Sequence, residues 1–212
     1  MRFTLLALAA GLAIGLVTGG RLSHLGSRGL RLWPLLLAGL ALQPLSVRLD
    51  GGAATAALVG SYALLLAFAL ANVAVVGMWL VATGIALNLA VITVNSGMPV
   101  RPSALRAAGL VGEGAADHLR PAPTRASSPE REPVPARAVL AAKHHLERPS
   151  DRLVVLGDII PVAPLREVVS FGDVAMAVGL ADVVAHLLRP LAGRRARSPG
   201  GGDPVEAAGA GG

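Results

Sequence analysis

Long uncharged segments alternate with short charged ones along this 212-residue chain. Residues 3–20, 32–47 and 51–100 carry no charge, and residues 171–188 are apolar apart from Asp173, Asp182 and His186. A helix rises about 1.5 Å per residue, so roughly 17–25 residues cross a hydrocarbon core of about 30 Å. The segment 51–100 is too long for one span and must fold back. A turn at 72–77 predicts helices near 53–71 and 78–94, which gives five transmembrane helices in total.

The first apolar segment has a second interpretation, a cleaved signal peptide. Only Arg2 precedes the segment, and no clear A-x-A cleavage site follows it. Both features favour a membrane span over a signal peptide. The alternative stays open at this point.

The fold class predicted is an all-α membrane protein, a bundle of about five transmembrane helices with a long, partly disordered loop between helices four and five. Residues 1–100 form a four-span region, 101–170 an extracytoplasmic loop, 171–188 the fifth helix and 189–212 a disordered cytoplasmic tail. Within the loop, a short helix over 103–108 follows Pro102. The proline-rich residues 109–135 are expected to be disordered. A short interfacial helix is predicted near 136–146, and the apolar residues 153–162 are too short to span, so they are interfacial, re-entrant or packed on the bundle.

Composition agrees with a membrane location. Hydrophobic residues make up 53% of the chain and charged residues 15%, against about 25% in an average soluble domain. Cysteine is absent, which excludes disulfides, cysteine-ligated metals and thiol nucleophiles. The net charge of +6 does not indicate nucleic acid, because the charges avoid the apolar segments and fall in loops. The partner that the pattern predicts is the lipid bilayer, in the bacterial cytoplasmic (inner) membrane.

Arginine positions predict the orientation of the chain. Basic residues near span ends favour the cytoplasmic side. Seven arginines flank one side of a five-span arrangement and two flank the other: Arg21, Arg28, Arg31, Arg189, Arg194, Arg195 and Arg197 against Arg2 and Arg48. The N-terminus is therefore predicted outside and the C-terminus in the cytoplasm.

Small residues recur on one face of the first predicted helix. Ala7, Gly11, Gly15 and Gly19 follow one another at a spacing of four, and such a stripe lets helices approach closely in lipid. The stripe predicts a helix contact, either within the chain or with a second copy or another membrane protein.

Polar residues within the apolar segments form the candidate chemistry. Asn88 shares a stripe with Gly77, Gly84 and Asn95, and its amide must be hydrogen-bonded if it lies in hydrocarbon. Gln43 is one plausible partner. In the fifth helix, Asp182 and His186 are four residues apart and can pair, whereas Ser170 and Asp173 have the spacing of a capping box.

Two motifs resemble those of an uncharacterised bacterial membrane family, domain of unknown function 5317. The first is GIALNLAVITVNSGMPV at residues 84–100. The second combines HHL at 144–146, LGDIIP at 156–161 and VSFGD at 169–173. The resemblance covers most of the chain, from about Met1 to His186. It implies a small polytopic inner-membrane protein, and no catalytic residue comes with it.

Both motifs fall near the predicted outer interface. We therefore expect the loop to fold back as a cap on the bundle, with Asn95, His144, Asp158 and Asp173 in one polar cluster. Together with the deeper groups, the candidate site residues are Asn88, Asn95, His144, Asp158, Asp173, Asp182 and His186.

Three functions are compatible with these residues. The favoured one is a non-enzymatic membrane scaffold that binds a partner. The alternative is a small transporter or permease component that uses Asn88, Asp182 and His186 along a polar route. A membrane-embedded hydrolase or transferase using His144 and Asp158 is a third, although no G-x-S-x-G, H-E-x-x-H, Walker or G-x-G-x-x-G motif is present. The sequence predicts no cofactor and no metal site, and adjacent His144 and His145 fit surface histidines better than metal ligands.

Overall fold

The structure of the chain is a computed structural model, and it describes residues 2–24, 29–111 and 144–189. In this part of the chain the protein is mostly helical. The helices are α1 (Arg2–Val17), the 3₁₀ turn η1 (Leu22–His24), α2 (Trp33–Ser46), α3 (Gly51–Ala71), α4 (Met78–Asn95), α5 (Pro102–Ala107) and α7 (Phe171–Leu188). The turn predicted at 72–77 and the helix predicted after Pro102 are both confirmed.

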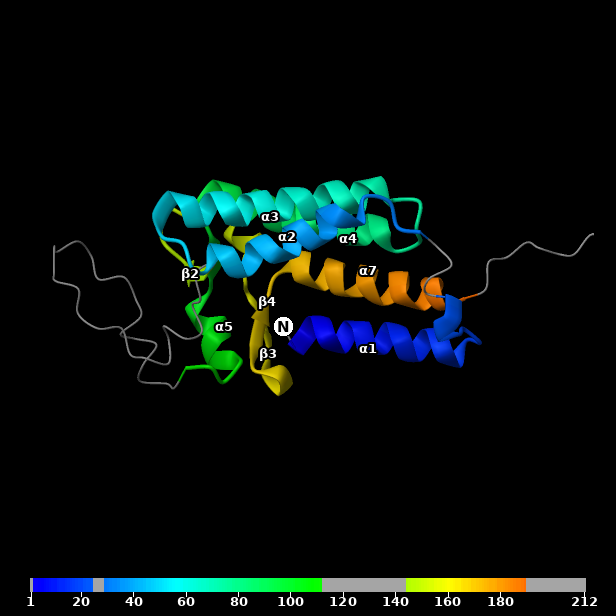
Figure 1. Cartoon of the computed structure of the whole chain (residues 1–212). Helices are drawn as coiled ribbons and strands as arrows, with labels where there is room; N and C mark the ends of the chain where they lie inside the picture. Colours follow the sequence, from blue (N-terminus) through cyan, green and yellow to red (C-terminus); the bar gives the residue numbers. More distant parts are fainter. Residues whose placement is uncertain (1, 25–28, 112–143, 190–212) are drawn as a thin grey trace, which may run out of the picture.

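The five longer helices lie side by side in the order α2, α3, α4, α7, α1, and each packs on its neighbour (Figure 1). Hydrogen bonds place the helix ends. The Arg21 N–H donates to the Leu188 carbonyl at 2.8 Å, so α1 and α7 end together. At the other end, the Arg2 N–H donates to the Glu167 carboxylate just before α7. Along the chain the five longer helices therefore alternate in direction, and α1 and α7, which are neighbours in the row, run parallel to each other. The starts of α1, α3 and α7 and the ends of α2 and α4 share one end, which we call the cap end (Figure 1).

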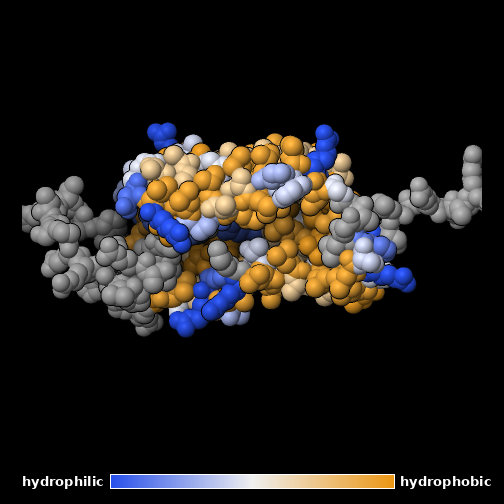
Figure 2. All heavy atoms as spheres, in the orientation of Figure 1, coloured by the Kyte–Doolittle hydropathy of each residue, from blue (hydrophilic) through white to orange (hydrophobic). Residues whose placement is uncertain are grey.

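Within the described ranges, three helices are long and apolar enough to cross a membrane: α3, α4 and α7. α1 is a shorter apolar helix of 16 residues, and α2 has 14 residues. At about 1.5 Å per residue these two are roughly 24 and 21 Å long. Figure 2 shows hydrophobic side chains along the sides of the helices and hydrophilic ones gathered mainly toward the two ends.

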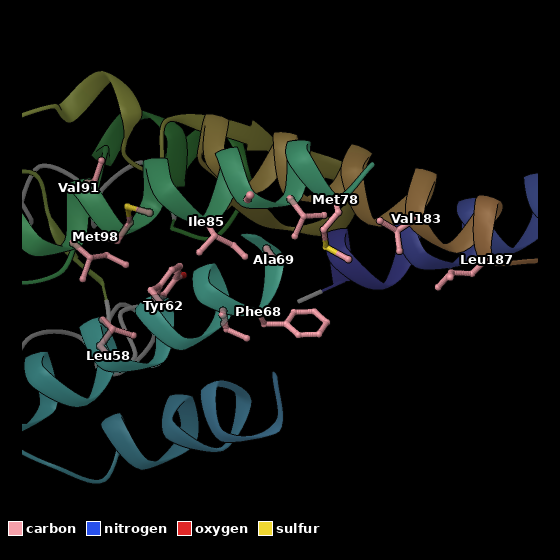
Figure 3. Packing of buried hydrophobic residues seen from close by; sticks show 14 residues of the cluster. Leu58, Tyr62, Phe68, Ala69, Met78, Ile85, Val91, Met98, Val183 and Leu187 are labelled. Atoms are coloured by element: carbon pink, nitrogen blue, oxygen red, sulfur yellow. The ribbon is translucent and has the colours of Figure 1, made fainter. Parts of the chain in front are cut away.

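Large apolar side chains fill the space between α3 and α4 (Figure 3). Tyr62, Phe68 and Ile85 are all buried there, and the same cluster continues to Leu187 on α7. Close packing of these side chains stabilises the helix pair through dispersion contacts, and this holds also where lipid rather than water surrounds the protein. Large side chains therefore hold this pair of helices together.

Glycines set the contact between α4 and α7. Gly77 and Gly84 lie seven residues apart on α4, and Gly172 and Gly179 are seven apart on α7. A Cβ added at Gly179 would lie 2.8 Å from the Gly77 carbonyl oxygen, and one at Gly172 would lie 2.7 Å from that of Gly84. Because the helices are antiparallel, the two glycine pairs match, and the backbones approach closely at both.

Short strands occupy the cap end, which corrects the all-α prediction. β1 (Met98–Val100) pairs in parallel with β2 (His144–Leu146), and β3 (Ile160–Val162) pairs antiparallel with β4 (Glu167–Val169). Two 3₁₀ turns, η2 (Val154–Leu156) and η3 (Ala163–Leu165), connect them. We call these elements and α5 the cap. The cap lies at one end of the helix row in Figure 1.

The helix predicted near 136–146 is wrong at its end, where His144–Leu146 is strand β2. Pairing with β1 supplies the backbone partners that a helix would have supplied internally. The rest of that prediction, the disorder predicted over 112–135 and the tail from residue 190 lie outside the described residues.

Candidate functional site

A buried polar network joins α4 to the start of α7. The Asn88 side-chain amide donates from Nδ2 to Asp173 Oδ1 at 2.8 Å, and its Oδ1 accepts a hydrogen bond from Ser170 Oγ at 3.0 Å. Asn88 and Ser170 are both fully buried, and the buried Tyr62 hydroxyl lies beside Asn88. An amide at this depth is costly unless both its ends are paired. Asn88 therefore serves as a hydrogen-bonding link between helices, with Ser170 and Asp173 rather than Gln43 as its partners.

Ser170 and Asp173 also begin α7 as the capping box that their spacing predicts. Ser170 Oγ accepts from the Asp173 N–H at 3.0 Å, and Asp173 Oδ2 accepts from the Ser170 N–H at 3.1 Å. Asp173 thus uses one carboxylate oxygen for the cap and the other for Asn88. The carboxylate also lies in the first turn of α7, where the helix dipole stabilises a negative charge. These contacts give Asp173 a structural role before any ligand is considered.

Asn95 fastens the cap to the last turn of α4. Its Nδ2 donates to the Arg152 carbonyl at 2.8 Å, and its Oδ1 accepts from the Arg152 N–H at 2.8 Å. A single amide side chain thereby satisfies both backbone groups of a residue 57 positions away. Asn72 does the same at the opposite end of the row, where its amide bonds the N–H and the carbonyl of Arg31 at 2.8 Å each. Asn72 is not among the candidate residues predicted from the sequence, where its signal is its position just after an apolar run.

His144 and Asp158 meet inside the cap. His144 Nδ1 lies 3.0 Å from Asp158 Oδ2, and only 4% of the Asp158 side chain is exposed. The backbone of Asp158 is held as well, because its N–H donates to Pro99 and its carbonyl accepts from Arg101. A second pair, His145 Nε2 to Asp151 Oδ2 at 3.0 Å, lies alongside and was not predicted. Because strand residues alternate in direction, adjacent histidines reach two different carboxylates.

Asp182 and His186 pair near the end of α7 away from the cap. His186 Nδ1 lies 2.9 Å from Asp182 Oδ1, and both side chains are partly exposed. Asp182 follows Asp173 by nine residues, which at about 100° per residue turns the helix by two and a half turns. The two carboxylates therefore lie on opposite faces of α7, about 13 Å apart along its axis. The structure does not bring Asn88 and Asp182 to one polar surface.

The seven candidate residues thus fall into four groups rather than one cluster. Asn88 bonds Asp173, Asn95 bonds the backbone of Arg152, His144 pairs with Asp158, and Asp182 pairs with His186. The first three groups lie toward the cap end.

A family model described as a family of unknown function, DUF5317, matches residues 34–185, well over half of the chain. The chain belongs to this family. No curated protein and no solved structure matches it. The matched range includes both motifs and all the candidate residues except His186.

The first helix of this DUF5317 chain precedes the matched range, yet it is tightly held. Its small residues face α7: a Cβ at Gly15 would lie 3.2 Å from the Ala185 Cα, and Gly11 sits against the Ala181 backbone. The helix contact predicted from the small-residue stripe is thus made within the chain at these two glycines. A contact with a second copy through Ala7, Gly11, Gly15 and Gly19 stays a prediction.

Glu167 caps the start of α1 from strand β4. Its two carboxylate oxygens accept from the Arg2 and Phe3 N–H groups at 2.6 and 2.9 Å. Burial raises the pKa of Glu167, but hydrogen bonds, including these two, outweigh burial and leave the pKa below its usual value. Sequence reasoning could not find this contact, because it joins residues 165 positions apart.

Proposed function

We propose that this protein is a five-span, non-catalytic component of the bacterial cytoplasmic membrane that binds a membrane-protein partner. One observation carries the proposal. Each buried polar side chain in the described part of the chain has a partner within the chain: Ser46, Ser61, Asn72, Asn88, Asp158 and Ser170. Buried polar groups that are already paired have structural roles, so a function is better sought on the outer surface.

The alternating direction of the five helices along the chain supports five spans. Figure 1 shows α1 and α2 running alongside the three longer helices and nearly parallel to them. A span shorter than the hydrocarbon core is accommodated by local thinning of the bilayer and by flanking residues that reach the interface. Arg31 and the exposed Trp33 at the start of α2 are residues of that kind.

The same geometry supports an orientation with the cap outside. Trp33 and Trp79, each 57% exposed, begin the two helices that start at the end away from the cap. Arg21, Arg31 and Arg189 also lie at that end, and basic residues favour the cytoplasmic side. A C-terminal alkaline phosphatase fusion should therefore be inactive and a C-terminal fluorescent protein fusion bright. The opposite pattern would overturn this orientation.

An apolar outer surface is available for a partner. Leu37 and Leu40 on α2 are 54% and 49% exposed, and α2 lies at the edge of the helix row, where it packs on α3. Lipid covers such a face by default. A partner would compete with lipid there through close packing rather than through hydrophobicity.

Site-specific photocross-linking in cells tests the proposal. A photoreactive residue at Leu37 or Leu40 should give one cross-linked protein in common, whereas the same residue at the fully buried Ile92 should give none. Different proteins at the two α2 positions would indicate random collision. Lipid adducts alone at both positions would contradict partner binding by α2.

The transporter alternative rests on one feature, the partial exposure of the Asp182–His186 pair. Because the chain has no cysteine, Asp182→Cys can be probed with a membrane-impermeant thiol reagent added from each side in turn. A transporter predicts labelling from both sides, since alternating access opens the site to each. Labelling from one side or none would favour the scaffold.

A further inference from the structure

The chain between β2 and β3 wraps around the outer end of α4. After β2 it turns back at residues 148–151, where Asp151 accepts a hydrogen bond from the Arg148 N–H at 2.8 Å. The side chain of Asn95 then holds the backbone of Arg152, and η2 packs on α4. We call residues 148–156 the wrap. Contacts fix both of its ends: the Arg148–Asp151 hydrogen bond holds the start, and Leu156 packs on the hydrophobic core at the end.

The wrap exposes two apolar side chains although a third, Leu156, is turned inward. Leu153 is 47% exposed and Val155 is 61% exposed. Leu153 also has a φ of 54°, a left-handed conformation that leucine rarely adopts. A strained backbone that directs apolar groups outward favours a role for those groups outside the protein.

Arginines accompany these apolar groups. Arg148 and Arg152 are exposed, and neither guanidinium group forms an ion pair with a described residue. The acidic groups nearby are occupied instead: Glu147 pairs with Arg101, Asp151 with His145, and Asp158 with His144. The wrap therefore presents a positive and apolar surface beside the end of α4.

We propose that the wrap is a membrane anchor that binds anionic phospholipid. Leu153 and Val155 enter the interface beside α4, and Arg148 and Arg152 hold the lipid phosphate. Interfacial segments combine these same two kinds of residue, apolar groups for the acyl boundary and arginine for the headgroups. The inference rests on the membrane placement proposed above, and it adds the lipid class and the residues that bind it.

Depth measurements test the apolar half of the proposal. The chain lacks cysteine, so single nitroxide labels can be placed on the full protein in nanodiscs of phosphatidylethanolamine and phosphatidylglycerol. A label at Val155→Cys should be accessible to oxygen and protected from a water-soluble nickel chelate. A label at Ser150→Cys, on the same segment, should show the reverse. Equal chelate accessibility at both positions would overturn the proposal.

A third label separates this failure from failure of the membrane placement. Leu37→Cys lies on the exposed side of α2 and should be immersed whether or not the wrap is an anchor. A chelate-accessible label there would contradict the five-span proposal itself. An immersed Leu37→Cys beside an aqueous Val155→Cys would contradict only the anchor.

Lipid retention tests the arginines. Native mass spectrometry should show phosphatidylglycerol retained over phosphatidylethanolamine, with the enrichment reduced several-fold in an Arg148→Gln/Arg152→Gln variant. Both substitutions leave the backbone contact of Asn95 in place. Arg106→Gln, which changes an exposed arginine on α5, is the matched control and should retain the enrichment. No loss in the double variant, an equal loss in the control, or full displacement of lipid by inorganic phosphate would overturn the assignment.

Discussion

Gly172 is a position where one added methyl group should destabilise the fold. A Cβ at this residue would overlap the side-chain oxygen of Asn88 and lie 2.7 Å from both Asn88 Cγ and the Gly84 carbonyl oxygen. Ordinary contacts begin near 3.4 Å. To accept alanine, α7 must move away from α4 or the Asn88 amide must rotate out of its two hydrogen bonds.

Both routes lead to a similar free-energy cost. Overpacking a well-packed interface costs about 1–3 kcal/mol. Hydrogen bonds between membrane helices contribute about 0.6 kcal/mol each on average, and more where one partner is charged, so losing two costs roughly 1–2 kcal/mol. Alanine also gains about 0.5–1 kcal/mol of helix propensity over glycine. We expect Gly172→Ala to lower the free energy of unfolding by about 0.5–2 kcal/mol.

Gly60→Ala is the matched control, because it makes the same change inside α3 where the nearest atom to the new Cβ is 4.0 Å away. It should leave the protein unchanged or up to about 1 kcal/mol more stable. Reversible unfolding of both variants in mixed detergent micelles, followed by circular dichroism, measures the difference. Adding Asn88→Ala should recover part of the Gly172→Ala loss, since the side chain in the way is removed. Equal stability of the two glycine variants would refute the close α4–α7 packing.

Three further predictions concern contacts in α1, α4 and α7. Glu167→Gln should destabilise the protein at neutral pH, and the difference in unfolding free energy from the wild type should shrink below about pH 4.5. A carboxylate whose pKa is lowered in the folded state stabilises the protein above its unfolded-state pKa, and this stabilisation is lost as the pH falls through the folded-state pKa. A constant difference in unfolding free energy across this range would contradict the charged contact. Asn88→Leu and Asp173→Asn should be non-additive by roughly 0.5–1.5 kcal/mol in a double-mutant cycle, and strict additivity would mean that the 2.8 Å contact contributes nothing. The intact mass of the protein purified from membranes should include α1, and a mass that lacks the first helix would support the signal-peptide interpretation. Gly11→Leu should lower the melting temperature, whereas Ala10→Leu, on the exposed side of α1, should not.

Much of the helical part of the fold could be predicted, because apolar length and glycine position are local properties. The bounds of α7, Phe171–Leu188, are those of the apolar segment, and the turn between α3 and α4 lies where the fifty-residue run had to fold back. The capping box at Ser170 and Asp173 is likewise local, since its two residues are three apart. The stripe of Gly77, Gly84 and Asn88, which is visible in the sequence, also marks the face of α4 that contacts α7.

The cap could not be predicted in the same way. Strand β2 exists because β1 lies beside it, although 43 residues separate Val100 from His144 in the sequence. The three residues His144–Leu146 are too few to show a helical or strand periodicity, so nothing in the local sequence argues against the helix predicted there. The pairing of His145 with Asp151 depends on that strand, and so does the separation of the candidate residues into four groups.

Three asparagines show why the function should lie outside the helix row. They lie at three levels of the row: Asn72, Asn88 and Asn95. The side-chain amide of each donates a hydrogen bond to another segment of the same chain, namely the loop before α2, the start of α7 and the wrap, respectively. Glycine contacts then bring α7 against α4 on one side and α1 on the other. Polar groups used in this way cannot also bind a solute unless these contacts break. The groups that the described structure leaves exposed include the apolar faces of the outer helices and the arginines of the wrap, and both are suited to lipid and to proteins embedded in it.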